Sequence, residues 1–447
     1  MTKTLLVAGY WLLDVTIGHI KTSISKHSAP HNLQRATSNQ QPATSTSSAR
    51  RILSYLAVLL YIIFLPSLSS GTTTQPILDL IKANDSILVA DHAGRILLAK
   101  NDMVKRIPAS TLKILTALAA FHFLGEDYRF TTEFYTDDKG NLKVKGYGDP
   151  LLISEVLQEI ASLLAKKITR CNSLIIDNSY FSKQVTIPGA SCSANPYDAP
   201  LSALSANFNT VNFKRDNSGR IISAEPQTPM IPYASEKIAK KIESDRMSLF
   251  KDSREASLYA GHLVLYFLRE NGVTVPETVR MGTVLPGDKL LYTYTSRFAI
   301  KDVAVKLFQF SNNFIANQVV VALGANVFGP PGTLDKGTRA VLDYAQNVLG
   351  LHGIRFVEGS GISRQNRLSA RDMLTILKKL EPHRSLLVKK DNIYYKTGTL
   401  HGIQTRAGYI ETESDPLYFV LFLKTPGVNA DRLINMIVNA YMSPGRH

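Results

Sequence analysis

The apolar positions of this chain fall into blocks that predict both helices and strands. Residues 110–125 are apolar on nearly every side after Lys113, so this stretch predicts a buried helix. Pro108 stands where a first helical turn tolerates proline, and Gly125 stands where a C-cap is expected. An amphipathic run over residues 298–310 predicts a second helix, which would deliver the residues after it to a helix end.

Strand patterns lie at both ends of the chain. Apolar and polar residues alternate over 86–99 on both sides of a turn at Asp91-His-Ala-Gly94, which predicts a hairpin. The unbroken apolar run 417–423 predicts a buried strand. The segment between the first helix and residue 289 contains many short strand-like runs. A terminal helix is predicted to pack one apolar face on the sheet, formed by Leu433, Ile434, Ile437, Val438 and Tyr441.

The first 70 residues differ from the rest of the chain. Residues 1–49 are rich in Ser, Thr and Gln after a short apolar start, which predicts a polar extension without a packed core. Arg50 and Arg51 precede an apolar run over 52–65 and a small-residue exit, the pattern of a signal peptide over 50–70. This pattern predicts export to the periplasm or cell envelope. The alternative is an uncleaved inner-membrane anchor formed by residues 52–70, although the run is shorter than the roughly 20 residues of a membrane-spanning helix.

Composition narrows the classes of partner. The chain has 447 residues, enough for two or more domains, and a net charge of +15. A basic surface suits peripheral association with an anionic cell wall or with lipid headgroups. Nucleic acid is not expected, because no basic stripe is interleaved with aromatic residues and no zinc or helix-turn-helix pattern occurs.

The two cysteines, Cys171 and Cys192, lie in the exported part of the chain. Export permits a disulfide between them, but two separate buried thiols fit the sequence as well. No Cys or His pair has the spacing of metal ligands, so we expect no metal and no cofactor.

Three short polar motifs carry the candidate chemistry. They are Ser110-Thr-Leu-Lys113, Ser311-Asn-Asn313 and Lys396-Thr-Gly398. Residues three apart share a helix face, so the Lys113 amine can lie against the Ser110 hydroxyl. A serine hydroxyl needs an adjacent base, and a lysine can serve if burial and neighbouring cations lower its pKa.

Each motif alone is weak, and the chain offers competing matches. S-x-x-K also occurs at 23–26, and S-x-N also occurs at 193–195 and 205–207. K-T-G occurs once, and the chosen motifs combine a buried helix, a helix end and an apolar strand. A Ser-His-Asp hydrolase is disfavoured because the chain has no G-x-S-x-G elbow.

The order S-x-x-K, S-x-N, K-T-G is typical of penicillin-recognising serine acyl-transferases. From about residue 86 onward the chain resembles the class C low-molecular-mass penicillin-binding proteins, D-Ala-D-Ala carboxypeptidases/endopeptidases of peptidase family S13. The further segments that carry the resemblance are Ile107-Pro-Ala-Ser-Thr, Gly146-Tyr-Gly-Asp-Pro-Leu151, Ile176-Asp-Asn-Ser-Tyr-Phe181, Tyr197-Asp-Ala-Pro-Leu-Ser-Ala-Leu204 and Glu358-Gly-Ser-Gly-Ile-Ser-Arg364. Two features depart from the family: Asn317 stands where many relatives have a glutamate, and residues 381–390 replace a longer connection near the K-T-G strand.

The resemblance implies an α/β fold of the β-lactamase/transpeptidase type, an antiparallel sheet flanked by helices with an inserted accessory domain. Residues 71–130 and 290–447 would form this discontinuous catalytic domain. Residues 131–289 would form one or more inserted accessory domains.

The resemblance also implies a role for each motif residue. Ser110 would be the nucleophile, Lys113 its base, Ser311 a proton relay, and Asn313 a hydrogen-bond partner of the substrate backbone. Lys396 and Thr397 would bind the terminal carboxylate, and Gly398 would leave room for substrate along the strand edge. The backbone N–H groups of Ser110 and Thr399 would form the oxyanion hole.

The implied activity is that of a serine D-Ala-D-Ala carboxypeptidase, and of a D,D-endopeptidase where the carbonyl lies in a cross-link. Its partners would be peptidoglycan stem peptides, with β-lactams as covalent inhibitors. Two alternatives stay open. A serine β-lactamase would need a fast deacylating water, for which the sequence shows no dedicated base, and a penicillin-recognising sensor would acylate without turnover.

Overall fold

The computed structural model describes residues 74–191 and 193–442. The predicted polar extension and signal segment lie outside these residues, as does Cys192. Within the described ranges, no helix combines the length and apolar character needed to cross a membrane.

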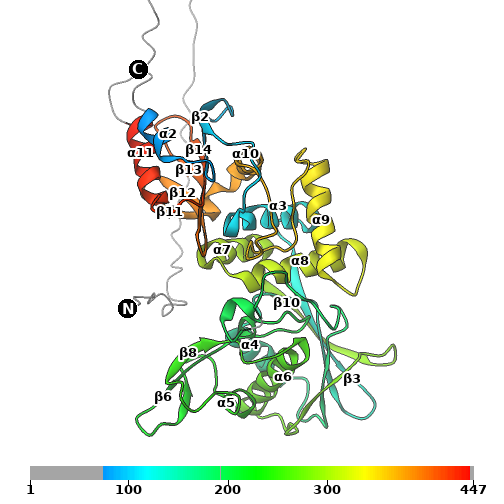
Figure 1. Ribbon diagram of the computed structural model, residues 1–447. Helices are drawn as coiled ribbons and strands as arrows, with labels where there is room; N and C mark the ends of the chain where they lie inside the picture. The colour runs from blue at the N-terminus through cyan, green and yellow to red at the C-terminus, as the bar shows by residue number, and fades with distance from the viewer. Residues whose placement is uncertain (1–73, 192, 443–447) are drawn as a thin grey trace, which may run out of the picture. The chain divides into compact units, whose positions relative to one another are not determined.

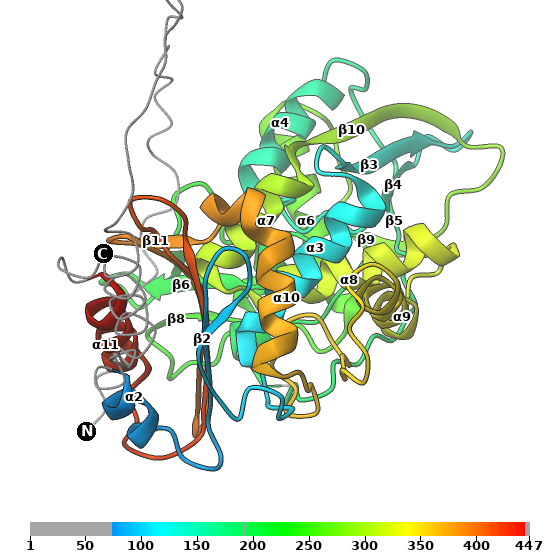
Figure 2. The same cartoon turned by 90° about the horizontal axis from the view of Figure 1, so that it is seen from above.

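Strands from the two ends of the described chain form a six-stranded antiparallel sheet (Figures 1 and 2). Its strands in spatial order are β11 (Val388–Lys390), β12 (Ile393–Leu400), β13 (Ile403–Ile410), β14 (Leu417–Leu423), β1 (Ser86–Ala90) and β2 (Ile96–Lys100). Helices α2 (Gln75–Leu80) and α11 (Ala430–Met442) cover one face, and α10 (Ala370–Leu380) lies on the other (Figure 2). The predicted hairpin and terminal helix are confirmed.

The unbroken apolar run of β14 follows from the position of this strand between β13 and β1. Val420 and Phe422 join the apolar core shared with α10, whereas Phe419 and Leu421 face the core beneath α11. Because both faces of this strand are covered, no position in its centre needs to be polar. The strand predicted over 417–423 is confirmed.

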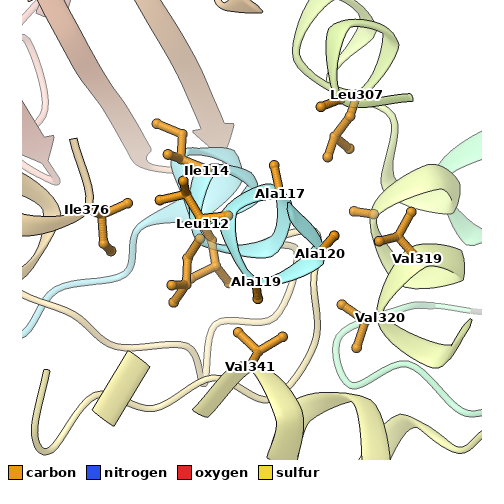
Figure 3. Close-up of a cluster of buried hydrophobic side chains, with 14 of the residues drawn as sticks. Leu112, Ile114, Ala117, Ala119, Ala120, Leu307, Val319, Val320, Val341 and Ile376 are labelled. Carbon is orange, nitrogen blue, oxygen red and sulfur yellow. The ribbon is translucent and has the colours of Figure 1, made fainter. Parts of the chain in front are cut away.

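Helix α3 (Lys113–Leu124) is the centre of the helical layer. It is surrounded by α7 (Ile300–Phe310), α8 (Asn313–Phe328), α9 (Leu334–Asn347) and α10. Figure 3 shows Ala117, Ala119 and Ala120 directed at side chains of the surrounding helices. Small residues at these positions let the helices approach closely, and the first eight residues of α3 are all buried.

A second, five-stranded sheet is built mainly from the middle of the chain (Figure 1). Its spatial order is β10 (Lys289–Ala299), β3 (Arg129–Thr136), β4 (Leu142–Gly146), β5 (Leu174–Asp177) and β9 (Val279–Gly282). Strand pairs β4–β5 and β5–β9 are parallel, and α4 (Ser154–Leu164) and α6 (Ser253–Glu270) share its apolar core.

The remaining elements of this middle segment are short. A three-stranded sheet has the order β7 (Ile221–Ser223), β6 (Val211–Arg215) and β8 (Ser244–Met247), accompanied by α5 (Pro232–Ser235). Two single turns, η2 (Pro196–Asp198) and η3 (Asn207–Asn209), lie between β5 and β6 in the chain. The predicted domain division at residues 130 and 290 stays a prediction.

Candidate active site

Ser110 lies in a tight turn that leads into the buried helix. The turn, η1 (Ala109–Leu112), is a 3-10 helix, and the α-helix itself begins at Lys113 and ends before Gly125. The helix predicted from residue 110 therefore begins three residues later, because Ala109 has a positive φ of 47° and the chain winds more tightly there. Thr111 Oγ1 donates to the Pro108 carbonyl at 2.7 Å and holds the turn.

Lys113 is fully buried and connects three parts of the site. Its Nζ donates to Ser110 Oγ at 2.9 Å, to Asn313 Oδ1 at 2.8 Å and to the Ser360 carbonyl at 2.6 Å. Burial lowers the pKa of this amine well below its ordinary value, and the nearby Lys396 charge lowers it further. A neutral amine at this position can accept the Ser110 hydroxyl proton.

The Ser311-Asn-Asn313 motif is the junction between two helices. Ser311 ends α7 in a left-handed conformation with φ 50°, and Asn312 caps α8 by accepting from Ile315 N at 3.0 Å. Asn313 is the first residue of α8 and faces Lys113. The predicted placement of Ser311 at a helix end is confirmed.

Lys396 lies opposite, on β12, with 2% of its surface exposed. Its Nζ donates to Ser311 Oγ and to the Thr397 carbonyl, both at 2.8 Å. Burial first, and the charge of Arg406 on β13 second, lower the pKa of Lys396 to about 7. The motif Ser311-Asn-Asn313 thus receives hydrogen bonds from both buried lysines.

Among the described strands, β12 has a partner on only one side along the K-T-G segment. Strand β11 pairs only with residues Ile393, Tyr394 and Tyr395, whereas β13 pairs with β12 along its whole length. The predicted proximity of residues 381–390 to this strand is thereby confirmed. A cleft of about 570 Å³ lies here. It is lined by Ser110, Pro196, Tyr197, Phe310, Ser311, Asn312, Asn313, Ile362, Thr399 and Leu400.

Gly398 is required by the close approach of β12 to η1, the turn that carries Ser110 and is called the serine turn below. A Cβ at this position would collide with Thr405 Oγ1 and lie 2.8 Å from the Ser110 backbone nitrogen. Clearance for a substrate was the reason suggested by the sequence; the contacts in the structure are instead with the protein itself. Thr405 Oγ1 also donates to the Pro108 carbonyl at 2.8 Å, which ties β13 to the same turn.

The sequence did not assign a role to the Gly359–Ser363 loop. The Ser360 carbonyl in this loop is a direct partner of Lys113, and the Gly359 carbonyl accepts from Thr116 Oγ1 at 2.8 Å. Tyr197 and Phe310, which line the cleft and are 51% and 37% exposed, were also missed as lining residues. The Glu358-Gly-Ser-Gly sequence was the available signal for the loop.

Other candidate chemistry is limited in the part of the chain that the structure describes. Among these residues no cluster of His, Cys, Asp and Glu could hold a metal ion. Cys171 is a buried free thiol, and burial raises its pKa to about 11. The other cysteine, Cys192, lies outside the described ranges, so both alternatives for the two thiols stay open.

Comparison with known proteins gives consistent matches. The family model for the D-Ala-D-Ala carboxypeptidase 3 (S13) family matches residues 73–253 and 238–389. A D-alanyl-D-alanine carboxypeptidase of Actinomadura sp. (strain R39) is 28% identical over 348 residues, covering 66% of this chain and 64% of that protein. The D-alanyl-D-alanine carboxypeptidase DacB of Haemophilus influenzae is 24% identical over 415 residues, covering 76% of this chain and 83% of that protein.

A solved structure matches the fold. The crystal structure of penicillin-binding protein 4 (dacB) from Haemophilus influenzae has a TM-score of 0.66 at 20% identity, covering 83% of this chain and 98% of that one. The predicted α/β fold, an antiparallel sheet flanked by helices, is confirmed by this match and by the sheet order above. The chain spans just under two thirds of the length of the Actinomadura protein.

Proposed function

The chain belongs to the D-Ala-D-Ala carboxypeptidase 3 (S13) family, and we propose that it is a serine-type D-Ala-D-Ala carboxypeptidase that acts on peptidoglycan stem peptides. One observation carries the proposal: Lys113 Nζ contacts both Ser110 Oγ and Asn313 Oδ1. Ser110 and Asn313 lie at a cleft that is also lined by Thr399 and Leu400 of β12, the strand that carries the buried Lys396.

Substrate binding uses the free side of β12. An extended peptide adds to a strand edge through main-chain hydrogen bonds. Within residues 74–191 and 193–442, no strand pairs with residues 396–400 on the side opposite β13. The Lys396 ammonium and the Thr397 hydroxyl bind the terminal carboxylate, and the Asn313 amide binds the peptide backbone. A carboxylate beside Lys396 favours its protonated form, which would otherwise lose its proton near pH 7.

Acylation then begins at Ser110. Neutral Lys113 accepts the hydroxyl proton while Ser110 Oγ attacks the carbonyl carbon of the penultimate D-Ala. The backbone N–H groups of Ser110 and Thr399 stabilise the oxyanion. The C–N bond breaks, the leaving D-Ala amine takes a proton relayed through Ser311, and water later hydrolyses the acyl-enzyme.

The Ser311 relay is supported by its contact with Lys396, 2.8 Å away. Because Lys396 Nζ donates to Ser311 Oγ, a proton passed from Ser311 to the leaving amine can be replaced by one from the Lys396 ammonium. The same acylation by a β-lactam retains the leaving nitrogen in the product, which makes β-lactams covalent inhibitors. A carbonyl within a peptide cross-link would make the reaction that of an endopeptidase.

The place of action follows from the same proposal. Stem peptides lie outside the cytoplasm, so residues 50–70 are assigned as an export signal and the enzyme as a periplasmic or cell-envelope protein. Peripheral association with the anionic wall through the basic surface belongs to this proposal.

The test is to treat the purified protein with a fluorescent penicillin, and separately with a muropeptide that ends in D-Ala-D-Ala. We expect covalent labelling and D-Ala release, both lost in Ser110→Ala. Ser414→Ala, which alters an exposed serine on the turn between β13 and β14, is the matched control and should behave as wild type.

Other outcomes would point to the alternatives. Labelling without D-Ala release would favour the sensor or a cross-linked substrate, and rapid turnover of a chromogenic β-lactam would favour the β-lactamase. Labelling of Ser110→Ala at the wild-type level would show that the nucleophile is misassigned.

A further inference from the structure

A buried carboxylate lies directly behind the site. Glu358 is fully buried, and its two oxygens accept six hydrogen bonds from neutral donors. Oε1 accepts from Gly361 N at 2.8 Å, Ser363 N at 3.2 Å and Asn366 Nδ2 at 2.7 Å. Oε2 accepts from Ser360 N at 2.7 Å, Ser360 Oγ at 2.6 Å and Asn317 Nδ2 at 3.2 Å.

This carboxylate gives the loop its shape. Because backbone N–H groups of residues 360, 361 and 363 all point at Glu358, the chain curls around it and directs the Ser360 carbonyl outward to Lys113 Nζ, 2.6 Å away. The loop also packs tightly on the serine turn: a Cβ on Gly361 would collide with the Ala109 carbonyl. The position of the loop is therefore coupled to the positions of both Ser110 and Lys113.

Asn317 fixes the other end of the same peptide segment. Its Oδ1 accepts from Gly359 N at 2.7 Å while its Nδ2 donates to Glu358 Oε2. Asn317 lies on α8, the helix whose first residue, Asn313, also contacts Lys113. The amide thus links the helix that carries one Lys113 partner to the loop that carries another.

We propose that Glu358 and Asn317 form a positioning pair, in which the carboxylate and the amide hold the Ser360 carbonyl and thereby set the location and charge state of the Lys113 amine. The pair touches neither Ser110 nor the cleft surface, so it acts through Lys113. This role deepens the proposed function and rests on Lys113 being the base of that reaction.

Two charged groups act on the Lys113 amine with opposite effects on its pKa. Lys396 on β12 lowers the pKa of Lys113, and Glu358 raises it. Ser110, Asn313 and the Ser360 carbonyl, which also face the amine, are neutral, and Arg406 acts on Lys396. Removing the Glu358 charge should therefore lower the pKa of Lys113 further.

Three single variants separate position from charge. Glu358→Gln keeps the size and removes the charge, Glu358→Asp keeps the charge and shortens the reach, and Glu413→Gln is an exposed control on the turn after β13. We measure the second-order rate of acylation by penicillin from pH 5 to 10, together with thermal unfolding. Misplacement of a reacting group by about 1 Å costs about 10²-fold in rate, so both Glu358 variants should slow acylation by about that factor.

The pH dependence distinguishes the two variants. Lys113 must be neutral to accept a proton, so the acidic limb of the profile reports its pKa. In Glu358→Gln this limb should move to lower pH, whereas in Glu358→Asp it should stay near the wild-type position. A purely structural role would slow acylation in both variants without moving the limb.

Exchanging the two side-chain types tests the pair itself. In the double variant Glu358→Gln/Asn317→Asp, the amide introduced at position 358 can donate to the carboxylate introduced at position 317, which still accepts from Gly359 N. The hydrogen bond between the two side chains is reversed and the negative charge is retained, but Ser360 N and Ser360 Oγ lose their acceptor at Oε2, so the rescue is expected to be partial. We expect each single variant to be slower than the double variant, and the acidic limb of the double variant to return toward wild type.

Direct titration of Lys113 gives a result that does not need activity. With ¹³Cε-labelled lysine, the Lys113 resonance is identified by its loss in Lys113→Arg, and its pKa is compared between wild type, Glu358→Asp and Glu358→Gln. An unchanged pKa and an unchanged acylation profile in folded Glu358→Gln would overturn the inference. So would a double variant no faster than its slower parent.

If Glu358→Gln does not fold, Glu358→Asp and Asn317→Asp decide the question, since wild-type acylation rates in both would contradict the pair. A wild-type protein that neither labels with penicillin nor releases D-Ala would contradict the proposed function instead. In that case the Lys113 titration still decides whether Glu358 controls the amine.

Discussion

Lys396 Nζ donates to Ser311 Oγ across the cleft at 2.8 Å, so the K-T-G strand and the S-x-N junction are in direct contact through side chains. The other buried lysine, Lys113, reaches the same junction through Asn313 Oδ1. Ser311 and Asn313 therefore separate two amines of depressed pKa, each with its own partner. In the proposed reaction, this arrangement would keep a proton acceptor beside Ser110 and a proton donor beside the leaving group.

Removing the Ser311 hydroxyl should break the path from Lys396 to the leaving amine. We expect Ser311→Ala to lower kcat for D-Ala release by about 10² to 10⁴, the usual contribution of a positioned proton-transfer group. KM should change less, because Lys396 remains available to bind the carboxylate. Steady-state kinetics on a D-Ala-D-Ala peptide provide the measurement, and a kcat within about twofold of wild type would contradict the relay.

The alkaline limb of kcat/KM should follow the proton on Lys396. A carboxylate substrate needs the ammonium form, so activity should fall as the pH rises through about 7. Arg406→Gln removes a cation that lowers this pKa, and the limb should move to higher pH.

A substitution of Asp431 should move the alkaline limb in the opposite direction, because Asp431 forms an ion pair with Arg406 at 3.1 Å. Asp431→Asn leaves the Arg406 charge uncompensated and should move the limb to lower pH. If Arg406→Gln and Asp431→Asn both keep the wild-type pH profile, Lys396 does not set this limb.

Gly398→Ala should damage the serine turn rather than the cleft. The added Cβ would force Thr405 and the Ser110 backbone apart, and overpacking of this kind costs about 1–3 kcal/mol. We expect lower thermal stability together with a loss of penicillin acylation. Gly287→Ala is the control, since a Cβ there meets open space at an ordinary φ. An acylation rate unchanged by Gly398→Ala would mean that the turn tolerates displacement.

Asp149 should make the folded state less stable as the pH rises from about 4 to 6. Burial raises the pKa of this carboxyl to about 6, and its Oδ2 has no hydrogen-bond partner in the described structure. In that range the folded state keeps a proton that the unfolded state releases, so the free energy of unfolding falls.

Asp149→Asn removes this penalty and can still accept from Leu151 N through Oδ1. Two pKa units correspond to about 3 kcal/mol, which is the largest gain we expect at pH 7. Urea unfolding at pH 4 and pH 7 checks the difference, with exposed Asp138→Asn as control. A variant equally destabilised at both pH values would contradict the assignment.

The sequence predicted the parts of the fold that depend on local pattern. The run over 417–423 and the hairpin around Gly94 follow from apolar order and turn chemistry within a few residues. The parallel pairing of β4, β5 and β9 could not be predicted in this way, because such pairing depends on contacts between segments far apart in the chain.

In the site, too, features set by local sequence were predicted and features set by long-range contacts were not. Ser110, Lys113 and Lys396 were predicted to share a site because their motifs have fixed spacing, and the structure brings them together. Glu358 was not assigned a role, because its importance arises from donors at residues 317 and 366 and from a loop folded around it. The tight turn before Lys113 was also missed, since the positive φ of Ala109 is imposed by packing against Gly361 and Gly398.

The wide separation of the site residues along the chain has a consequence for biosynthesis. Lys113 and Asn313 are 200 residues apart, and Lys113 and the Ser360 carbonyl are 247 apart. During synthesis from the N-terminus, Ser110 therefore emerges long before the groups that contact Lys113. Under the proposed function, Ser110 would remain an ordinary hydroxyl until β12 and the loop at Glu358 have docked. The protein would then become reactive only when almost the whole chain has emerged, and truncated chains would not be acylated by penicillin.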